Sequence, residues 1–144
     1  MNYDPNNVFA RILRGELPSF KVYEDDMTYV MMDIMPQTKG HLLVLTKEPA
    51  PTLFDLSVEG AQACVATAKK IAPALMKITG ADGMIFSQFN GEIAGQTVYH
   101  VHFHLVPRYE GQTVREHARE QGNMEDIKAL AEQIAAELNQ RKLT

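Results

Sequence analysis

The sequence predicts an α+β domain in which helices cover one face of an antiparallel sheet. Five short runs have strand character, and three segments repeat apolar residues at helical spacing. Along the chain they follow the order helix, three strands, helix, two strands, helix. Strands that follow one another through short loops pair antiparallel. At 144 residues the chain is long enough for one domain with a core of its own, which we place at 1–144.

The first helix should begin with Asp4 as N-cap and Pro5 at its first position, and end at Gly15. A second helix should run from an N-cap at Ser57 to Gly80, with a kink or break at Pro73. The last helix is expected over about 124–141, capped by Asn123, after an irregular stretch at 108–123. The predicted strands are residues 20–23, 28–34, 41–45, 83–89 and the run around 100–105.

Composition restricts the class of protein. A hydrophobic content of 45% and a charged content of 22% are typical of a soluble globular domain. The net charge of −4 gives no electrostatic reason to expect nucleic acid as a partner. No run approaches the roughly 18 apolar residues of a membrane span, and the N-terminus lacks the basic and apolar regions of a signal peptide. Cys64 is the single cysteine, which suits a reducing compartment and a buried, inert thiol, so we expect a cytoplasmic protein.

Three of the five histidines, His100, His102 and His104, alternate with apolar residues within one run. Successive side chains of a strand point to opposite faces, so the three imidazoles should share one face, about 6.5–7 Å apart. Neighbouring imidazolium ions repel one another, so at least one ring should be neutral near pH 7. A neutral imidazole can act as a nucleophile, a base or a ligand. The run therefore indicates a functional site.

The stretch 95–108 reads Gly-Gln-Thr-Val-Tyr-His-Val-His-Phe-His-Leu-Val-Pro-Arg, and it resembles the histidine triad family. That family's motif is His-φ-His-φ-His-φ-φ, with φ apolar, and residues 100–106 match every position. The segment around His41, Lys-Gly-His-Leu-Leu-Val, is similar to the family's second signature. The resemblance implies a five-stranded antiparallel sheet, and a homodimer whose two sheets join into one of ten strands.

The resemblance also implies a nucleotide hydrolase or transferase. His102 would attack the α-phosphorus of a nucleoside monophosphate conjugate and form a nucleotidyl-histidine that water then hydrolyses. His100, His104 and His41 would donate hydrogen bonds to the phosphate, orient His102, or both. The substrate would be a purine nucleotide, held at its ribose, base and phosphate. The residues implied in substrate binding are Asp33, Ile34, Asn90, Gly95, Gln96 and Thr97, of which Asp33 and Ile34 match the segment that holds the ribose and one side of the base.

Two interpretations remain open for Phe9, Ile12, Val22 and Ile34: walls of a nonpolar slot for the base, or residues of the plain core. We expect no cofactor and no metal. Relatives with structural zinc carry two cysteines near the N-terminus and one further histidine, and the matching positions in this chain are Asn7, Ala10 and Pro49. His117, in a charged segment, is interpreted as an exposed residue.

Three functions remain open from the sequence. For an enzyme of this family, the substrate is an AMP phosphoramidate or a dinucleoside polyphosphate. Asp33 favours the first class, and the Val-Pro-Arg that ends the motif stretch favours the second. The chain could also be a non-catalytic nucleotide-binding regulatory module. A third alternative is a metal-dependent hydrolase with its ion at His100, His102 and His41.

Overall fold

The computed structural model describes residues 2–113 and 120–142. Its nine elements are α1 (Val8–Leu13), β1 (Lys21–Glu24), β2 (Thr28–Met32), β3 (Leu42–Thr46), α2 (Val58–Thr79), β4 (Gly83–Ser87), the 3₁₀ turn η1 (Glu92–Ala94), β5 (His102–Arg108) and α3 (Met124–Lys142). His117 lies outside the described residues. The order of helices and strands confirms the predicted α+β class.

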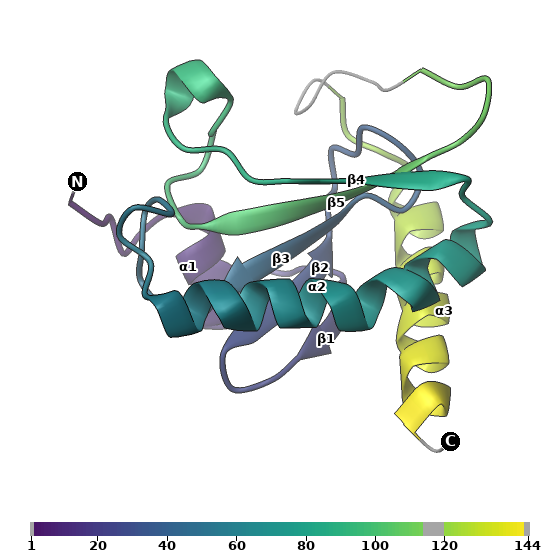
Figure 1. Cartoon of the computed structure of the whole chain (residues 1–144), viewed down its shortest axis with the longest axis horizontal. Helices are drawn as coiled ribbons and strands as arrows, with labels where there is room; N and C mark the ends of the chain where they lie inside the picture. The colour runs from purple at the N-terminus through teal and green to yellow at the C-terminus, as the bar shows by residue number, and fades with distance from the viewer. Residues whose placement is uncertain (1, 114–119, 143–144) are drawn as a thin grey trace.

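The five strands form one antiparallel sheet in the order β1-β2-β3-β5-β4. The long helix α2 carries the chain from β3 past β5 to the edge strand β4 (Figure 1). Both predicted antiparallel pairs of consecutive strands, β1 with β2 and β4 with β5, are confirmed.

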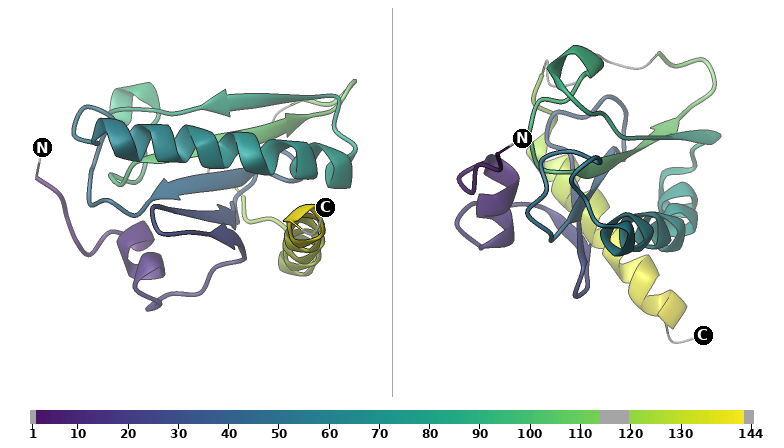
Figure 2. Two further views of the ribbon diagram at one scale, coloured as in Figure 1. Left: turned by 60° about the horizontal axis from the view of Figure 1, so that its bottom comes forward. Right: turned by 60° about the vertical axis from the view of Figure 1, so that its left-hand side comes forward.

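Two hydrophobic clusters lie on opposite faces of the sheet. The larger one packs α2 and α3 against side chains such as Val44, Phe103 and Leu105. The smaller one joins Phe9 of α1 to Leu43 and other alternate residues of β2 and β3. Figure 2 shows α1 on the side of the sheet away from α2 and α3. Because Phe103 and Leu105 point toward α2 and α3, the residues of β5 that alternate with them point toward the face that α1 covers.

The predicted start of the first helix is wrong. Asn7, not Asp4, is the N-cap of α1, and its side-chain oxygen accepts from the N–H of Ala10 at 2.9 Å. The carboxylate of Asp4 accepts instead from the N–H of Asn6, at 2.8 Å, in a turn before the helix. Both residue types cap helices well, and a single sequence does not decide between two such candidates three residues apart.

The two longer helices follow the prediction more closely. Ser57 caps the N-terminus of α2, and the C-cap residue that follows it, Gly80, is left-handed at φ 68°. The predicted alternative of a helix break at Pro73 is wrong, since α2 continues without interruption from Val58 to Thr79. Proline removes one backbone hydrogen bond, and packing on the sheet can outweigh that loss. Asn123 caps α3 by accepting from the N–H of Asp126 at 3.0 Å. None of the helices in the described part of the chain is long and apolar enough to cross a membrane.

Burial confirms the interpretation of the one cysteine. The side chain of Cys64 is fully buried in the core under α2. Burial raises the pKa of its thiol to about 12, so the reactive thiolate is not formed near neutral pH.

Candidate active site

The three triad histidines lie on the sheet face that α1 covers. His102 and His104 lie opposite Leu45 and Leu43 in the register of β3 with β5, and both leucines belong to the cluster on that face. All three histidines are buried, with exposed fractions of 1%, 5% and 2% along the chain. The ring centroids of His102 and His104 are 5.0 Å apart. The alternation predicted from the sequence is confirmed.

Strand β5 begins at His102, two residues later than expected. Just before this strand, the N–H of Val101 donates to the carbonyl of Ala50, and Nε2 of His100 lies 2.7 Å from the carbonyl oxygen of Thr46. A carbonyl can only accept, so Nε2 carries a proton and donates. The Thr46 carbonyl is thus held by an imidazole where the ladder would otherwise place a backbone N–H. His100 becomes a side-chain link between β3 and the start of β5.

Tyr3 completes the surroundings of His100. Its hydroxyl lies 2.7 Å from Nδ1 of His100, which must accept because the other ring nitrogen carries the proton. Burial lowers the pKa of the His100 imidazole below its ordinary value, and the bond to Thr46 offsets part of that shift, so the ring is neutral near pH 7. Both nitrogens of His100 are thus bonded to the protein itself. A direct part in the chemistry remains a prediction for this residue.

The backbone carbonyl of His100 determines which nitrogen of His102 is basic. Nδ1 of His102 lies 2.6 Å from the backbone carbonyl of His100 and must donate to it. A neutral ring with its proton on Nδ1 has its lone pair on Nε2. Phe9 packs edge-on against this ring, with centroids 4.8 Å apart. The fold therefore holds His102 in the tautomer that a nucleophilic Nε2 requires.

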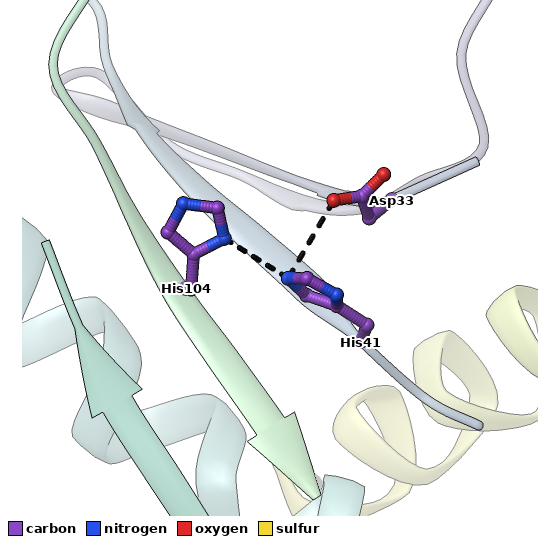
Figure 3. A group of neighbouring side chains, drawn as sticks. All are labelled: Asp33, His41 and His104. Atoms are coloured by element: carbon purple, nitrogen blue, oxygen red, sulfur yellow. Dashed lines mark hydrogen bonds and ion pairs between the residues drawn. The ribbon is translucent and has the colours of Figure 1, made fainter. Parts of the chain in front are cut away.

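His104 is held in the opposite tautomer, through His41. The N–H of Gln37 points at Nδ1 of His41, at 3.1 Å, so that nitrogen accepts and the proton of a neutral His41 is on Nε2. Nε2 of His41 lies 2.9 Å from Nδ1 of His104 and donates to it (Figure 3). A neutral His104 then carries its own proton on Nε2. Neighbouring triad rings therefore differ: His102 offers a lone pair, and His104 offers an N–H donor.

Asp33 approaches the same ring nitrogen of His41 that bonds to His104 (Figure 3). Its Oδ2 is 3.5 Å from Nε2 of His41, and its Oδ1 accepts from the N–H of Met35 at 2.8 Å. This turn ends β2 at Met32, before the predicted end of the strand at Ile34. Asp33 is 7% exposed, whereas Ile34 is 41% exposed. Contacts of both residues with a nucleoside remain predictions.

The loop before the triad is braced by the side chain of Gln96. Its Nε2 donates to the carbonyls of Pro51, at 2.7 Å, and Val98, at 3.0 Å, while its Oε1 accepts from the N–H of Gly91. Gln96 therefore has a structural part here, and contact with phosphate remains a prediction for it. Gly95 has a φ of 103°, a conformation that favours glycine.

Two other residues implied in substrate binding lie in or beside this loop. Asn90 accepts from the N–H of Leu53, at 2.7 Å, and its amide pairs with that of Gln88. Thr97 is exposed, so its hydroxyl lies at the surface of the protein.

Val22 cannot line a base slot beside the triad. It packs in the cluster under α2 and α3, on the face away from the triad. Phe9 and Ile12 belong to the cluster on the triad face.

A metal ion fits this site poorly. Among the described residues, Asp33, His41 and His104 place one ligand atom each within 4.8 Å of one another. Coordination through Nε2 of His41 would move the ring proton to Nδ1, where it would face the N–H of Gln37. The ligand set suggested by the sequence, His100, His102 and His41, also fits a metal poorly, because the two ring nitrogens of His100 already bond to Tyr3 and Thr46.

We also predict that the purified protein contains no structural zinc. The amide oxygen of Asn7 is used as a helix cap, and Pro49 stands where zinc-binding relatives have a histidine. Neither Asn7 nor Ala10 offers the thiolate or imidazole that such sites use. Elemental analysis should find far less than one zinc per chain. One zinc per chain that survives dialysis against a weak chelator would contradict the prediction.

Comparison with known proteins agrees with this geometry. The HIT domain family model matches residues 14–111. The crystal structure of a Hit-like protein from Bartonella henselae is 41% identical, with a TM-score of 0.90, and the match covers 95% of this chain and 99% of that one. A Zn-bound histidine triad family protein from Mycobacterium smegmatis is 31% identical, with a TM-score of 0.84, and the match covers 95% and 96%. The adenosine 5′-monophosphoramidase hnt1 of Schizosaccharomyces pombe is 34% identical over 137 residues, covering 91% of this chain and 97% of the relative.

The protein is therefore an α+β domain that brings four histidines together on one face of its sheet. The chain belongs to the histidine triad family. Its relatives support a nucleotide hydrolase in broad terms.

Tyr3 is the site residue that the sequence did not reveal, and its replacement gives a direct prediction. Tyr3→Phe removes the donor to the buried Nδ1 of His100, so the free energy of unfolding should fall by about 1–2 kcal/mol. Urea unfolding measures the loss. Tyr99→Phe is the matched control, because the Tyr99 hydroxyl accepts from the N–H of Glu92 at an exposed position. An equal effect of the two substitutions would contradict the role of Tyr3.

Proposed function

We propose that this protein cleaves nucleoside monophosphate conjugates at the α-phosphate, through a covalent nucleotidyl-histidine at His102. The observation that supports it most strongly is the hydrogen bond from Nδ1 of His102 to the carbonyl of His100, which leaves the lone pair on Nε2. An imidazole nitrogen attacks phosphorus at neutral pH and is also a good leaving group. One difficult displacement is thereby divided into two easier ones.

In the first step, Nε2 of His102 forms a bond to phosphorus, and the bond from phosphorus to the leaving group breaks. The leaving group departs with the electron pair, and an amine leaving group takes up a proton from solvent. In the second step water attacks, the N–P bond breaks and the nucleoside monophosphate is released. The Nε2–H of His104 is suited to donate to a phosphate oxygen that gains charge in both steps.

Among substrates, we propose a phosphoramidate of AMP rather than a dinucleoside polyphosphate. The support is the similarity to the fission-yeast relative, which is named an adenosine 5′-monophosphoramidase and is matched over nearly its whole length. A buried carboxylate at Asp33 near the histidine cluster agrees with the sequence feature that favoured this class.

The test is incubation of the protein with an AMP phosphoramidate, with and without EDTA. We expect AMP to be released at the same rate in both cases. Loss of activity in EDTA would favour a metal-dependent hydrolase. Tight binding of AMP without release from any AMP conjugate, diadenosine polyphosphates included, would favour a nucleotide-binding module.

We further propose that two copies pair along strand β4. This strand is at the edge of the sheet, and its burial is lower than that of β2, β3 and β5. Ile85 and Phe86 are consecutive, so they point to opposite faces, and they are 42% and 41% exposed. An exposed edge strand with apolar side chains is well suited to pair with its own copy.

Ile85→Lys should therefore convert a dimer into a monomer, because it places a charge in the paired edge. Light scattering should give twice the chain mass of 16.1 kDa for the wild type and that mass itself for the variant. Val58→Lys is the control, since Val58 is 67% exposed at the start of α2, away from β4 in the sequence. A monomeric wild type at high concentration would contradict the pairing.

A further inference from the structure

Asp33 is hydrogen-bonded to His41 through the backbone, and its carboxylate lies close to the His41 ring. Its N–H donates to the carbonyl of His41 at 2.9 Å, and its Oδ2 lies 3.5 Å from Nε2 of the same residue. The N–H of Met35 fixes the other carboxylate oxygen. At 7% exposure, the carboxylate is held in place and largely removed from water. It therefore acts on its nearest polar neighbour more strongly than a surface carboxylate would.

The carboxylate and the Gln37 amide act on His41 in the same sense. The negative charge beside Nε2 favours a proton on that nitrogen, and the Gln37 N–H at 3.1 Å disfavours a proton on Nδ1. The position of the proton on His41 in turn determines the tautomer of His104, because the Nε2–H of His41 donates to Nδ1 of His104. With Nδ1 accepting, His104 must present its proton on Nε2.

We propose that Asp33 is a positioning residue for the phosphate chemistry: it holds the proton of His41 on Nε2 and so keeps His104 as an N–H donor. This inference rests on the function proposed above for the same site. It assigns to Asp33 a role that does not depend on the sugar of the substrate. The family resemblance implies only a contact with the ribose, and the two roles can be separated by experiment.

The kinetic test combines Asp33→Asn with a change of sugar. Two AMP-type phosphoramidates are compared that share adenine and leaving group, one with ribose and one with 2′,3′-dideoxyribose. If Asp33 acts through His41, the variant should lose about tenfold or more in kcat on both substrates, with little change in KM. A loss on the ribose substrate that disappears on the dideoxy substrate would overturn the proposal, because only a hydroxyl contact behaves in that way.

The second test reads the proton positions directly and needs no turnover. Long-range ¹H–¹⁵N correlation spectra of protein labelled at histidine distinguish Nδ1–H from Nε2–H rings. In the wild type, His41 and His104 should be Nε2–H tautomers and His102 the Nδ1–H tautomer. In Asp33→Asn, the signals of His41 and His104 should move toward a mixture of tautomers while His102 stays unchanged.

A matched control is Asp82→Asn, which removes a carboxylate from an exposed position that bonds to the N–H of Glu110. It should change neither the spectra nor the rates. Histidine spectra that are identical in wild type and Asp33→Asn would overturn the proposal. If the wild type turns over neither phosphoramidate, the proposed function fails, and the spectra alone still decide whether Asp33 sets the proton of His41.

Discussion

His102→Ala should reduce kcat/KM for an AMP phosphoramidate by at least about 10³-fold, because it removes the atom that forms the covalent intermediate. The ring of His102 is buried between Phe9 and His104. Among the three triad histidines, all within the described residues, His102 alone has its Nδ1 proton bonded to a backbone carbonyl. His104 and His41 are thus poor substitutes. AMP release, followed by chromatography, gives the rate.

Two controls show whether the loss is chemical. Phe103→Leu changes the next residue of β5, which packs on the opposite face against Phe86, and it should alter the rate only a few-fold. Imidazole added to His102→Ala should restore part of the activity by occupying the space of the missing ring. Activity of His102→Ala within tenfold of the wild type would mean that another group attacks phosphorus.

Gly40→Ala should lower the free energy of unfolding by about 2–4 kcal/mol. Gly40 has a φ of 90°, and a Cβ atom there would lie 2.7 Å from Cγ2 of Thr79 and 3.3 Å from both Leu75 and Pro107. Backbone strain and crowding between β3 and α2 therefore add together. Because His41 is the next residue, the rate of AMP release should fall as well. Urea unfolding at fixed temperature measures the stability.

Gly15→Ala separates the two causes. Gly15 has a similar φ of 79°, but nothing lies within 4 Å of the position of its Cβ. This variant should lose only the cost of the left-handed conformation, about 1 kcal/mol. Equal losses at Gly40 and Gly15 would show that the close packing around Gly40 contributes nothing.

The strands could be predicted because each alternates or is apolar throughout, and a period of 2 assigns the faces. On that basis the sequence placed His102 and His104 together and Phe103 on the core side. The pairing of His41 with His104 could not be obtained from periodicity. It depends on the register of β3 with β5, which brings together residues 63 positions apart.

Side-chain hydrogen bonds account for most of what was missed. Tyr3 lies 97 residues from His100 in the sequence, and a single tyrosine near an N-terminus carries no pattern. At the late start of β5, likewise, the imidazole of His100 bonds to the Thr46 carbonyl while the N–H of Val101 donates to Ala50. Local competition of this kind also misplaced the first helix, where Asp4 and Asn7 are both good caps.

The covalent intermediate at His102 is the central claim, and intact-protein mass spectrometry tests it most directly. The protein should be mixed with an AMP phosphoramidate, quenched within the first turnover and analysed under conditions that preserve N–P bonds. We expect a population heavier by one adenylyl group, located on the peptide that contains His102 and absent from His102→Ala. Release of AMP at full rate with no adduct at any quench time, or an adduct on another residue, would contradict the proposal.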